Sequence, residues 1–390
     1  MSEVPKSELS PAEHQAMLFQ LEGECLDHMQ LDKALGAIDR LRKRYTPNPE
    51  TTLEARALFV VGYAGAGKST LLAQYERNER MKPGAFRSDQ DGDVRPVVRL
   101  QVPSSAQKRQ FVSAIVGALG YKAQADVDST AIVLEIGDLC RRMGVQVILL
   151  DEAHELTKGG GKRVEVIQEF VKSLLNQTGV QFVLAGLPGV LDLQPEEQVG
   201  RRMAPVFYLA PYDWGTEEGR VEFATLLVEL EAKVGVPFVP SLLDDPVLQA
   251  RMYYATKGRI GLVSKYMSAA LDKVLHGELE KITPYDLGVI FDEFRPKPMP
   301  AIAPVEFDAP PVAAAVRTVP VAGNPFLVEV DEFRRMWNSW LAVGEDGSGD
   351  EETEAAPAKP DATKNDYKPR KREGQRKGTF RGPKAADGRR

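Results

Sequence analysis

Two short motifs contain residue types that could bind and cleave a nucleoside triphosphate, and the first is rich in glycine. Residues 62–70 read Gly-Tyr-Ala-Gly-Ala-Gly-Lys-Ser-Thr. Glycines let the backbone turn successive N–H groups toward phosphate oxygens, and the helix expected from Lys68 onward adds the positive end of its dipole. Lys68 is predicted to reach the β- and γ-phosphates, and the Ser69 hydroxyl to ligate Mg²⁺. The predicted ATP-binding residues are Gly62, Tyr63, Ala64, Gly65, Ala66, Gly67, Lys68, Ser69 and Thr70.

The second motif is an apolar run that ends in two carboxylates, Asp151 and Glu152. Ligands bind α/β sheets at the carboxyl ends of the strands, where this pair is expected. Asp151 is predicted to hold Mg²⁺, and Glu152 to polarise the attacking water as general base. His154 completes the helicase-like sequence Asp-Glu-Ala-His, but no second ATPase core follows, so we interpret it as a helix-start residue. Together the motifs predict a Mg²⁺-dependent ATPase with Lys68, Asp151 and Glu152 as catalytic residues.

Three arginines farther along the chain could stabilise charge on the γ-phosphate. Arg201 and Arg202 come directly before an expected strand, where oligomeric ATPases carry an arginine that reaches a neighbouring subunit's nucleotide. A solvated basic turn explains this pair equally well. Arg259, within Gly-Arg-Ile-Gly, is predicted to fold back onto the phosphates, and the alternative is an ordinary helix start.

Four basic residues outside these motifs are candidates for binding DNA. Lys108 and Arg109 begin the helix expected after the second strand, and Lys162 and Arg163 follow three consecutive glycines. Cationic side chains and helix-start N–H groups both attract phosphate oxygens. The segment 364–390, with eleven Lys or Arg against three acids, is a further candidate. For each group a solvated surface fits equally well.

A sheet is needed to bring these residues together, and the sequence predicts one. Five short runs, nearly continuous in Val, Ile and Leu, alternate with helical patterns, as in a parallel sheet covered by helices on both faces. The expected strands are 57–61, 96–102, 145–150, 180–185 and 205–209, and the expected helices are 68–80, 107–119, 128–143 and 162–177. The predicted fold class is therefore α/β, a three-layer P-loop domain with a five-stranded parallel sheet.

Composition divides the chain into four predicted parts. They are an N-terminal helical segment (1–48), the ATPase core (49–212), a helical lid subdomain (213–295) and a mostly disordered tail (296–390). The tail is Pro-rich, then acidic, then basic, and such a segment cannot bury enough apolar surface to fold alone. A short amphipathic helix near 327–341 is the exception, and a helix that short should need a surface to dock on.

Whole-chain composition favours an ordinary cytoplasmic protein. Hydrophobic residues make up 43% and charged residues 27% of the chain, no apolar run could cross a bilayer, and the polar N-terminus has no signal pattern. Two cysteines, Cys25 and Cys140, are too few for a disulfide scaffold and are not spaced as metal ligands. The net charge of −6 says little about nucleic acid, because it averages an acidic body and a basic tail.

The order of these parts resembles that of the AAA+ ATPases of DNA transposition, the TniB/TnsC family, with MuB and IstB more distantly similar. Three segments carry the resemblance beyond the nucleotide motifs. They are 96–103, like that family's second strand, 196–202, like its arginine-bearing turn, and 209–214, like the entry to its lid. The resemblance covers roughly residues 15–294.

The resemblance implies an ATPase that assembles as a ring or helical filament on duplex DNA. Such a protein links a target-selection protein, TniQ-like or of CRISPR type, to a DDE transposase, and ATP turnover regulates where insertion happens. It also implies that Arg201 or Arg202 acts on a neighbouring subunit, and that Lys108 and Arg109 contact DNA. The nucleotide motifs keep the roles given above.

One departure from related ATPases bears on the rate of hydrolysis. They commonly place a polar residue at the end of the fourth strand, where it orients the attacking water. Here the sequence is Ala185-Gly186-Leu187, so slow hydrolysis is expected.

Two other classes of ATPase share the nucleotide motifs. An ATPase of the ExeA or STAND type, acting as a protein-interaction switch without DNA, would need a membrane segment or a repeat-built sensor domain, and the sequence shows neither. A helicase would need a second motor core.

Overall fold

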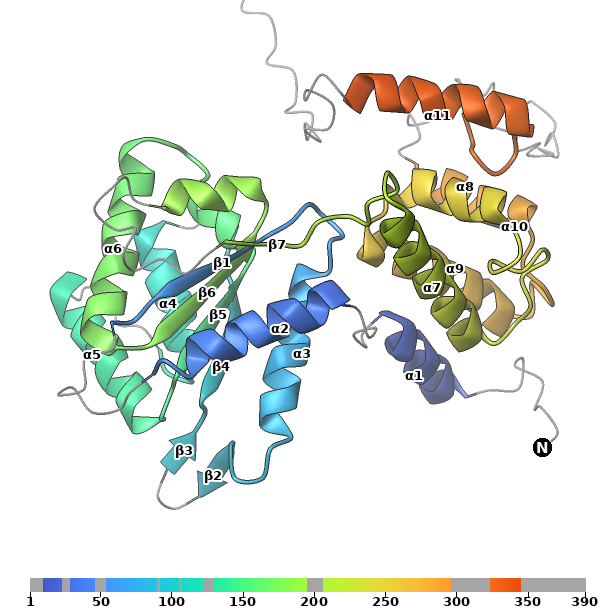
Figure 1. Ribbon diagram of the computed structural model, residues 1–390. Helices are drawn as coiled ribbons and strands as arrows, with labels where there is room; N and C mark the ends of the chain where they lie inside the picture. The colour runs from blue at the N-terminus through green and yellow to red at the C-terminus, as the bar shows by residue number, and fades with distance from the viewer. Residues whose placement is uncertain are drawn as a thin grey trace, which may run out of the picture. The chain divides into compact units, whose positions relative to one another are not determined.

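The computed structural model describes residues 10–22, 29–45, 54–89, 92–104, 107–122, 129–194, 206–295 and 323–344. At its centre five parallel strands form one sheet in the spatial order β4-β5-β6-β1-β7 (Figure 1). The strands are β1 (Ala57–Val61), β4 (Val97–Gln101), β5 (Val147–Asp151), β6 (Gln181–Gly186) and β7 (Phe207–Tyr208). The predicted five-stranded parallel sheet is therefore confirmed. Because all strands run the same way, the motifs that follow β1 and β5 lie at one edge, on either side of β6.

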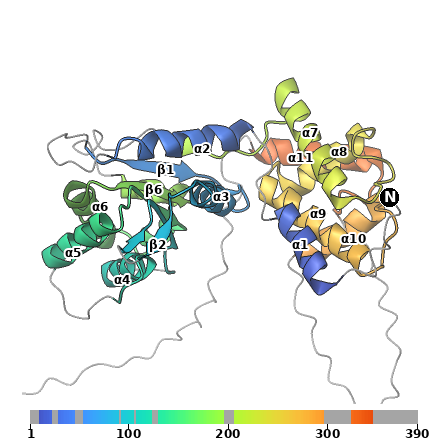
Figure 2. The ribbon, with the colours of Figure 1, turned by 90° about the horizontal axis from the view of Figure 1, so that it is seen from below.

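Helices cover both faces of the sheet, which is the middle of three layers (Figure 1 and Figure 2). One face carries α2 (Met29–Arg42) and α3 (Lys68–Arg80), and the other carries α4 (Lys108–Ala118), α5 (Ser129–Arg142) and α6 (Lys162–Thr178). Successive side chains of β1 point into two separate apolar cores, one on each face. Burial on both faces explains why the strand sequences are apolar without alternation.

A short antiparallel hairpin lies outside the five-stranded sheet and was not predicted. It consists of β2 (Arg87–Asp89) and β3 (Gly92–Val94). Its residues are mostly polar, so the apolar pattern that reveals a core strand is missing.

Four helices follow the sheet, as the sequence predicted. They are α7 (Glu217–Val234), α8 (Pro246–Thr256), α9 (Ile260–Leu275) and α10 (Pro284–Phe294). Side-chain caps fix where three of them begin, because Thr216, Asp245 and Thr283 each accept a hydrogen bond from the first turn. At α8 the cap and the following proline place the start at Pro246.

The N-terminal segment contains two helices where the sequence indicated one continuous helical region. The first, α1 (Pro11–Glu22), packs against α7 and α9. The second, α2, packs against α3 and the strands β1 and β6. Residues 23–28, between them, lie outside the described part of the chain.

The predicted amphipathic helix is α11 (Val330–Gly344), and the chain before and within it docks on α8 and α10. Asn324 Nδ2 donates to the Gly288 carbonyl at 2.9 Å. Arg251 donates to the carbonyls of Pro325 and Val328 at 2.7 and 2.8 Å. Phe333, on the first turn of α11, is buried. These contacts supply the surface that so short a helix needs.

Several sequence-based predictions concern residues outside the described ranges. They include Arg201, Arg202, Cys25, the proline-rich stretch at 296–322 and the acidic and basic runs after 344. Among the described helices, not one is both long and apolar enough to cross a bilayer. Cys140 is buried, and burial raises the pKa of its thiol to about 12, which leaves it unreactive.

Candidate nucleotide site

The loop between β1 and α3 is folded tightly around its own glycines. Gly65 and Gly67 have φ angles of 75° and 86°, in the left-handed region that favours glycine. A Cβ at Gly62 would lie 3.0 Å from both the Leu209 carbonyl oxygen and the Ala66 side chain. Since α3 begins at Lys68, its free N–H groups open directly onto this loop. The loop can therefore accept an anion with backbone donors.

Lys68 is buried inside the loop rather than extended into solvent. Its Nζ donates to the carbonyls of Gly62 and Tyr63 at 2.8 and 2.9 Å. Burial lowers the pKa of Lys68, while the nearby carboxylates of Glu152 and Asp151 raise it. A phosphate at this position would supply the negative charge that the buried ammonium needs.

Asp151 and Glu152 lie at the same edge of the sheet, at the end of β5. Asp151 is 5% exposed, and its Oδ1 accepts a hydrogen bond from the Glu152 N–H at 2.9 Å. Glu152 has φ 53°, a left-handed conformation that is uncommon for a residue other than glycine. The turn gives the two carboxyl groups different environments, one buried beside the strand and one facing the cavity.

His154 follows in a short 3-10 helix, Ala153–Leu156, and it is buried beside the Glu152 carboxylate. Its Nδ1 lies 3.2 Å from Glu152 Oε2. Burial lowers the pKa of His154, although the neighbouring glutamates raise it. The sequence predicted only a helix-start residue here, and the structure adds the contact with Glu152.

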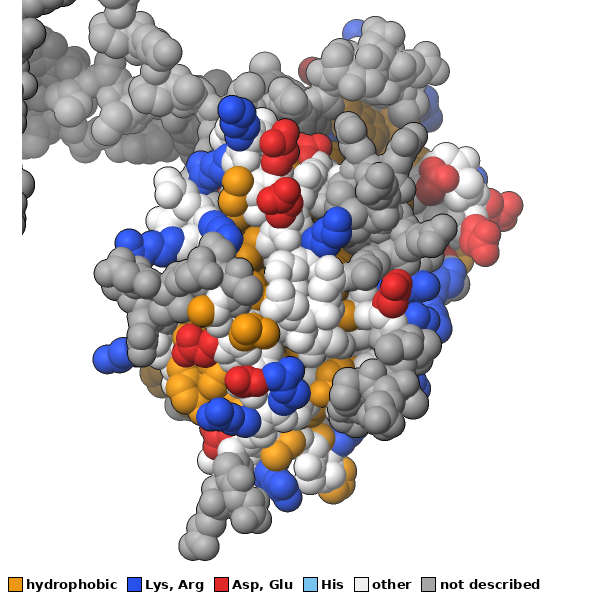
Figure 3. All heavy atoms as spheres, turned by 90° about the vertical axis from the view of Figure 1, so that its left-hand side faces the viewer, with side chains coloured by type: hydrophobic (Ala, Val, Ile, Leu, Met, Phe, Trp, Pro, Cys, Tyr) orange, Lys and Arg blue, Asp and Glu red, His pale blue; other side chains and the backbone are white. Residues whose placement is uncertain are grey.

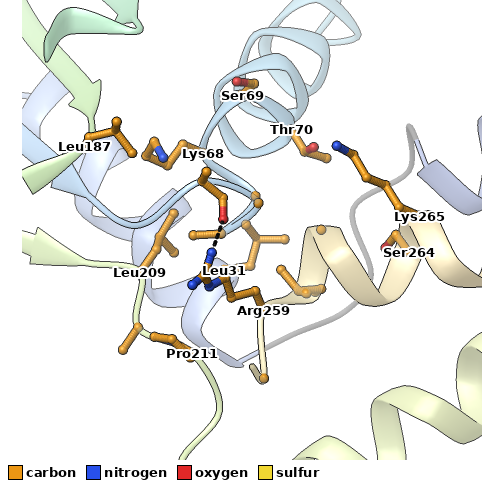
Figure 4. A pocket seen from close by; sticks show the side chains of 18 of the residues that line it. Leu31, Lys68, Ser69, Thr70, Leu187, Leu209, Pro211, Arg259, Ser264 and Lys265 are labelled. Atoms are coloured by element: carbon orange, nitrogen blue, oxygen red, sulfur yellow. Dashed lines mark hydrogen bonds between the residues drawn. The ribbon is translucent and has the colours of Figure 1, made fainter. Parts of the chain in front are cut away.

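These elements enclose a cavity of about 390 Å³ (Figure 4). The glycine-rich loop, Lys68, Ser69 and Thr70 line one end, together with Glu152. Apolar side chains from three other elements, Leu31, Leu209 and Pro211 among them, line another part. Leu187, at the end of β6, also lines the cavity, so the position where related ATPases commonly carry a polar residue presents a hydrocarbon here.

The remaining wall comes from the start of α9, nearly two hundred residues after the loop. The Gly261 N–H donates to the Gly65 carbonyl at 2.8 Å. A Cβ at Gly261 would lie 2.7 Å from that oxygen, so only glycine fits this approach. The contact joins the helical region directly to the phosphate loop.

Arg259 lines the cavity and contacts the loop. Its Nη1 lies 3.4 Å from the Ala64 carbonyl, and its guanidinium is 5.5 Å from the centre of the Tyr63 ring. Lys265, which the sequence reading missed, also lines the cavity, and Figure 4 shows its amine pointing toward Thr70. The sequence spacing could have revealed it. Lys265 comes four residues after Gly261, so both lie on the same face of the helix.

The four candidate DNA-binding cations are not among the residues that line the cavity. Lys108 and Lys162 are the first residues of α4 and α6, and Lys108 Nζ lies 5.0 Å from the Phe170 ring centre. Arg109 is exposed, and the Arg163 guanidinium lies beside Gly159. Phe170 lies about two turns after the start of α6, so Lys108 packs beside the middle of that helix and not beside Lys162.

Charge on the side of the α/β unit that carries α5 and α6 is mixed. Figure 3 shows Lys and Arg side chains interspersed with Asp, Glu and apolar groups among the described residues. No group of three or more His, Cys, Asp or Glu in the described ranges could hold a metal ion.

Comparison with known proteins identifies a family for part of the chain. Residues 24–212 match the model of the bacterial TniB protein family. None of the curated proteins matches the sequence. Among solved structures, Cdc6p from Pyrobaculum aerophilum is 13% identical, with 69% of each chain covered and a TM-score of 0.48. The ORC2 protein of Aeropyrum pernix is 14% identical, with 71% of each chain covered and a TM-score of 0.45. A Walker-type ATPase of Pyrococcus abyssi is 16% identical, with 65% of this chain and 73% of that chain covered and a TM-score of 0.36.

Proposed function

We propose, from the premise that residues 24–212 belong to the TniB family, that this AAA+ P-loop ATPase regulates DNA transposition. With ATP bound it oligomerises on duplex target DNA, hydrolyses ATP, and recruits or activates a DDE transposase at that target. The observation that carries the proposal is the coincidence of the family match with a complete nucleotide site. Lys68, Asp151 and Glu152 meet at one edge of the sheet, within the matched residues.

The cavity fits a nucleoside triphosphate. Backbone N–H groups at the start of α3 and the buried Lys68 suit the phosphates, because both provide donors and positive charge in a site partly removed from water. The apolar wall that includes Leu31 and Leu209 suits a nucleobase. ATP is therefore the proposed nucleotide.

Mg²⁺ is the proposed metal, held by Ser69 and Asp151 together with phosphate oxygens. Magnesium sites of nucleotide enzymes use one or two protein oxygens plus phosphates and water. When bound, the ion would neutralise phosphate charge.

Hydrolysis is assigned to Glu152, which faces the cavity and would take a proton from the attacking water. Arg201 or Arg202, outside the described residues, is the proposed contact with the neighbouring subunit's γ-phosphate. Arg259 is the proposed second arginine contact to the phosphates, and it would exchange its bond to the Ala64 carbonyl for a bond to phosphate. Slow turnover is expected, because Leu187 offers the attacking water no polar partner.

DNA binding is assigned to the starts of α4 and α6, with Lys108, Arg109, Lys162 and Arg163 as contacts. Both helices follow strands that end at the same sheet edge, and both start with cations where the helix dipole is positive. Few cations on a face of mixed charge should give binding that is weak for one subunit. Assembly on DNA would then add these weak contacts together.

The proposed partners are further copies of this chain, a DDE transposase and a target-selection protein, TniQ-like or of CRISPR type. A ring and a helical filament both remain open as the assembled form. A cytoplasmic location remains a prediction from the sequence.

Electron microscopy of the full chain with a non-hydrolysable ATP analogue and duplex DNA tests the proposal most directly. We expect ring or filament assemblies that need both nucleotide and DNA, and ATP hydrolysis that rises when DNA is added. A protein that stays monomeric at moderate salt and hydrolyses ATP at the same rate without DNA would contradict the proposal. That result would favour a protein-interaction switch of the ExeA or STAND type.

A further inference from the structure

The imidazole of His154 lies between two carboxylates, and the proposed reaction as described so far gives it no role. Its Nδ1 is 3.2 Å from Glu152 Oε2, and its Nε2 is 3.6 Å from Glu155 Oε1. His154 is 9% exposed and lines the nucleotide cavity together with Glu152. A buried imidazole within reach of the proposed general base is placed to act on it.

The backbone around His154 keeps the imidazole in this place. Its carbonyl accepts hydrogen bonds from the Thr157 N–H at 3.0 Å and the Thr157 hydroxyl at 2.7 Å. On the other side β6 approaches so closely that a Cβ at Gly186 would lie 2.9 Å from the backbone nitrogen of His154. The backbone is fixed from both sides, so only the side-chain torsions of His154 can move the ring relative to the carboxylates.

The partners of the two glutamates decide where a neutral imidazole should carry its proton. Glu155 Oε1 already accepts a hydrogen bond from Lys158 Nζ at 2.7 Å. The Glu152 carboxylate has no hydrogen bond to another side chain in the part of the chain that the structure describes. The proton therefore belongs on Nδ1, toward Glu152. Nδ1 lies within reach of Oε2 but off the hydrogen-bond line, and a small rotation of either side chain completes the bond.

We infer that His154 is a positioning residue for Glu152, which it holds by an Nδ1–H···Oε2 hydrogen bond. With Oε2 held, Oε1 is free to face the nucleotide and accept the proton of the attacking water. A glutamate side chain has three rotatable bonds, so fixing one oxygen removes much of the freedom that would misplace the other. The inference rests on the proposed ATPase function. It also gives the site a means of orientation that Leu187 does not provide.

Three substitutions in the full-length protein test the role of His154. His154→Ala should lower the rate of single-turnover hydrolysis at saturating ATP about tenfold, with the Kd for ATP unchanged, because only the orientation of Glu152 is lost. His154→Asn carries its amide nitrogen near the place of Nδ1 and should keep most of the rate. His154→Gln carries its amide nitrogen near the place of Nε2, toward Glu155, and should be as slow as the alanine variant.

The Asn and Gln variants are matched controls, since both are polar and differ only in which glutamate they can reach. Thermal unfolding of each variant shows whether it is folded, and if the alanine variant is not, the Asn and Gln pair still decides. Equal rates in Asn and Gln variants would overturn the inference. So would a loss of ATP affinity that accounts for the loss of rate.

Glu152→Gln separates this inference from the function on which it rests. If that variant hydrolyses ATP at the wild-type rate, the proposed general base is wrong, and the role of His154 is wrong with it. If it stalls while His154→Ala keeps full activity, the ATPase proposal stands and only the positioning role is lost.

Discussion

The two ends of the nucleotide cavity are built in different ways. The phosphate end is one continuous stretch, residues 62–70, whose backbone and Lys68 supply the binding groups. The opposite wall is assembled from α9 and from α2, which are far apart in the chain. The start of α9 meets the loop through the Gly261–Gly65 hydrogen bond and the Arg259 side chain. The first end is fixed by local conformation, whereas the part of the second end that comes from α9 exists only while the helical region is in place.

This difference suggests a division of tasks. A stretch that is shaped by its own glycines can bind phosphate whether or not the rest of the cavity is closed. A wall held by few contacts can respond to the nucleotide, or to whatever binds the helical region. The affinity for ATP should therefore depend mainly on the loop. The coupling between ATP binding and the position of the helical region should depend mainly on the wall.

The largest expected effect is that of Lys68→Ala at the phosphate end. Charge-assisted hydrogen bonds contribute about 1.5–3 kcal/mol each, and Lys68 is expected to bond both the β- and γ-phosphates. Losing about 3 kcal/mol or more should weaken ATP binding at least about 100-fold. Titration with a fluorescent ATP analogue measures the change. A Kd within threefold of the wild-type value would mean that Lys68 stays bonded to the loop carbonyls and does not reach the phosphates.

Glu152→Gln should affect the reaction and leave binding intact. General-base catalysis contributes about 100- to 10,000-fold, so turnover should fall by at least about 100-fold. The amide keeps the shape of the side chain, and the Kd for ATP should stay near the wild-type value. Parallel losses of binding and turnover would show that Glu152 serves the cavity's structure instead.

Gly261→Ala is the sharpest test of the opposite wall. The added methyl group would lie 2.7 Å from the Gly65 carbonyl oxygen, well inside contact distance. Overpacking of this kind costs about 1–3 kcal/mol, so ATP affinity should fall about tenfold as the wall is displaced. Gly36→Ala, on α2, is a suitable control, since the nearest atom to its new methyl is the flexible end of Arg40 at 3.4 Å. Unchanged affinity in Gly261→Ala would show that the loop binds ATP without this wall.

Lys265→Met should have the smallest effect on nucleotide binding. It tests whether Lys265 or Arg259, at the start of α9, contacts the nucleotide. Its amine points toward Thr70 (Figure 4), so its removal should weaken ATP and ADP binding by the same factor, about threefold to tenfold. Arg259→Met, which removes the contacts to Ala64 and Tyr63, is the matched variant. A loss confined to ATP in Arg259→Met, with Lys265→Met unaffected, would support the sequence-based assignment of Arg259 instead.

The two ends also differ in how far the sequence predicted them. The strand, loop and helix around Lys68 are consecutive, so their pattern contains the information that folds them. The burial of Lys68 against its own loop, by contrast, could not be predicted from the sequence, because it depends on how the side chain packs. The choice between Arg259 and Lys265 depends on the angle at which α9 approaches, which tertiary packing sets.

Elsewhere the misses have similar causes. The β2–β3 hairpin lacks an apolar face because it packs outside the core, and α8 starts at a cap that the apolar pattern does not register. The contact of His154 with Glu152 follows from the left-handed turn at Glu152, a conformation that the residue types around it do not predict.

The placement of the first two helices limits how far the cavity can open. α1 packs against α7 and α9, whereas α2 packs against α3 and the sheet. If the helical region swings away, α1 travels with it and α2 stays behind. The chain from Glu22 to Met29 is short, and at about 3.5 Å per residue it cannot stretch beyond about 25 Å. Covalent geometry thus bounds the separation of α1 and α2, however weak the contacts at the cavity become.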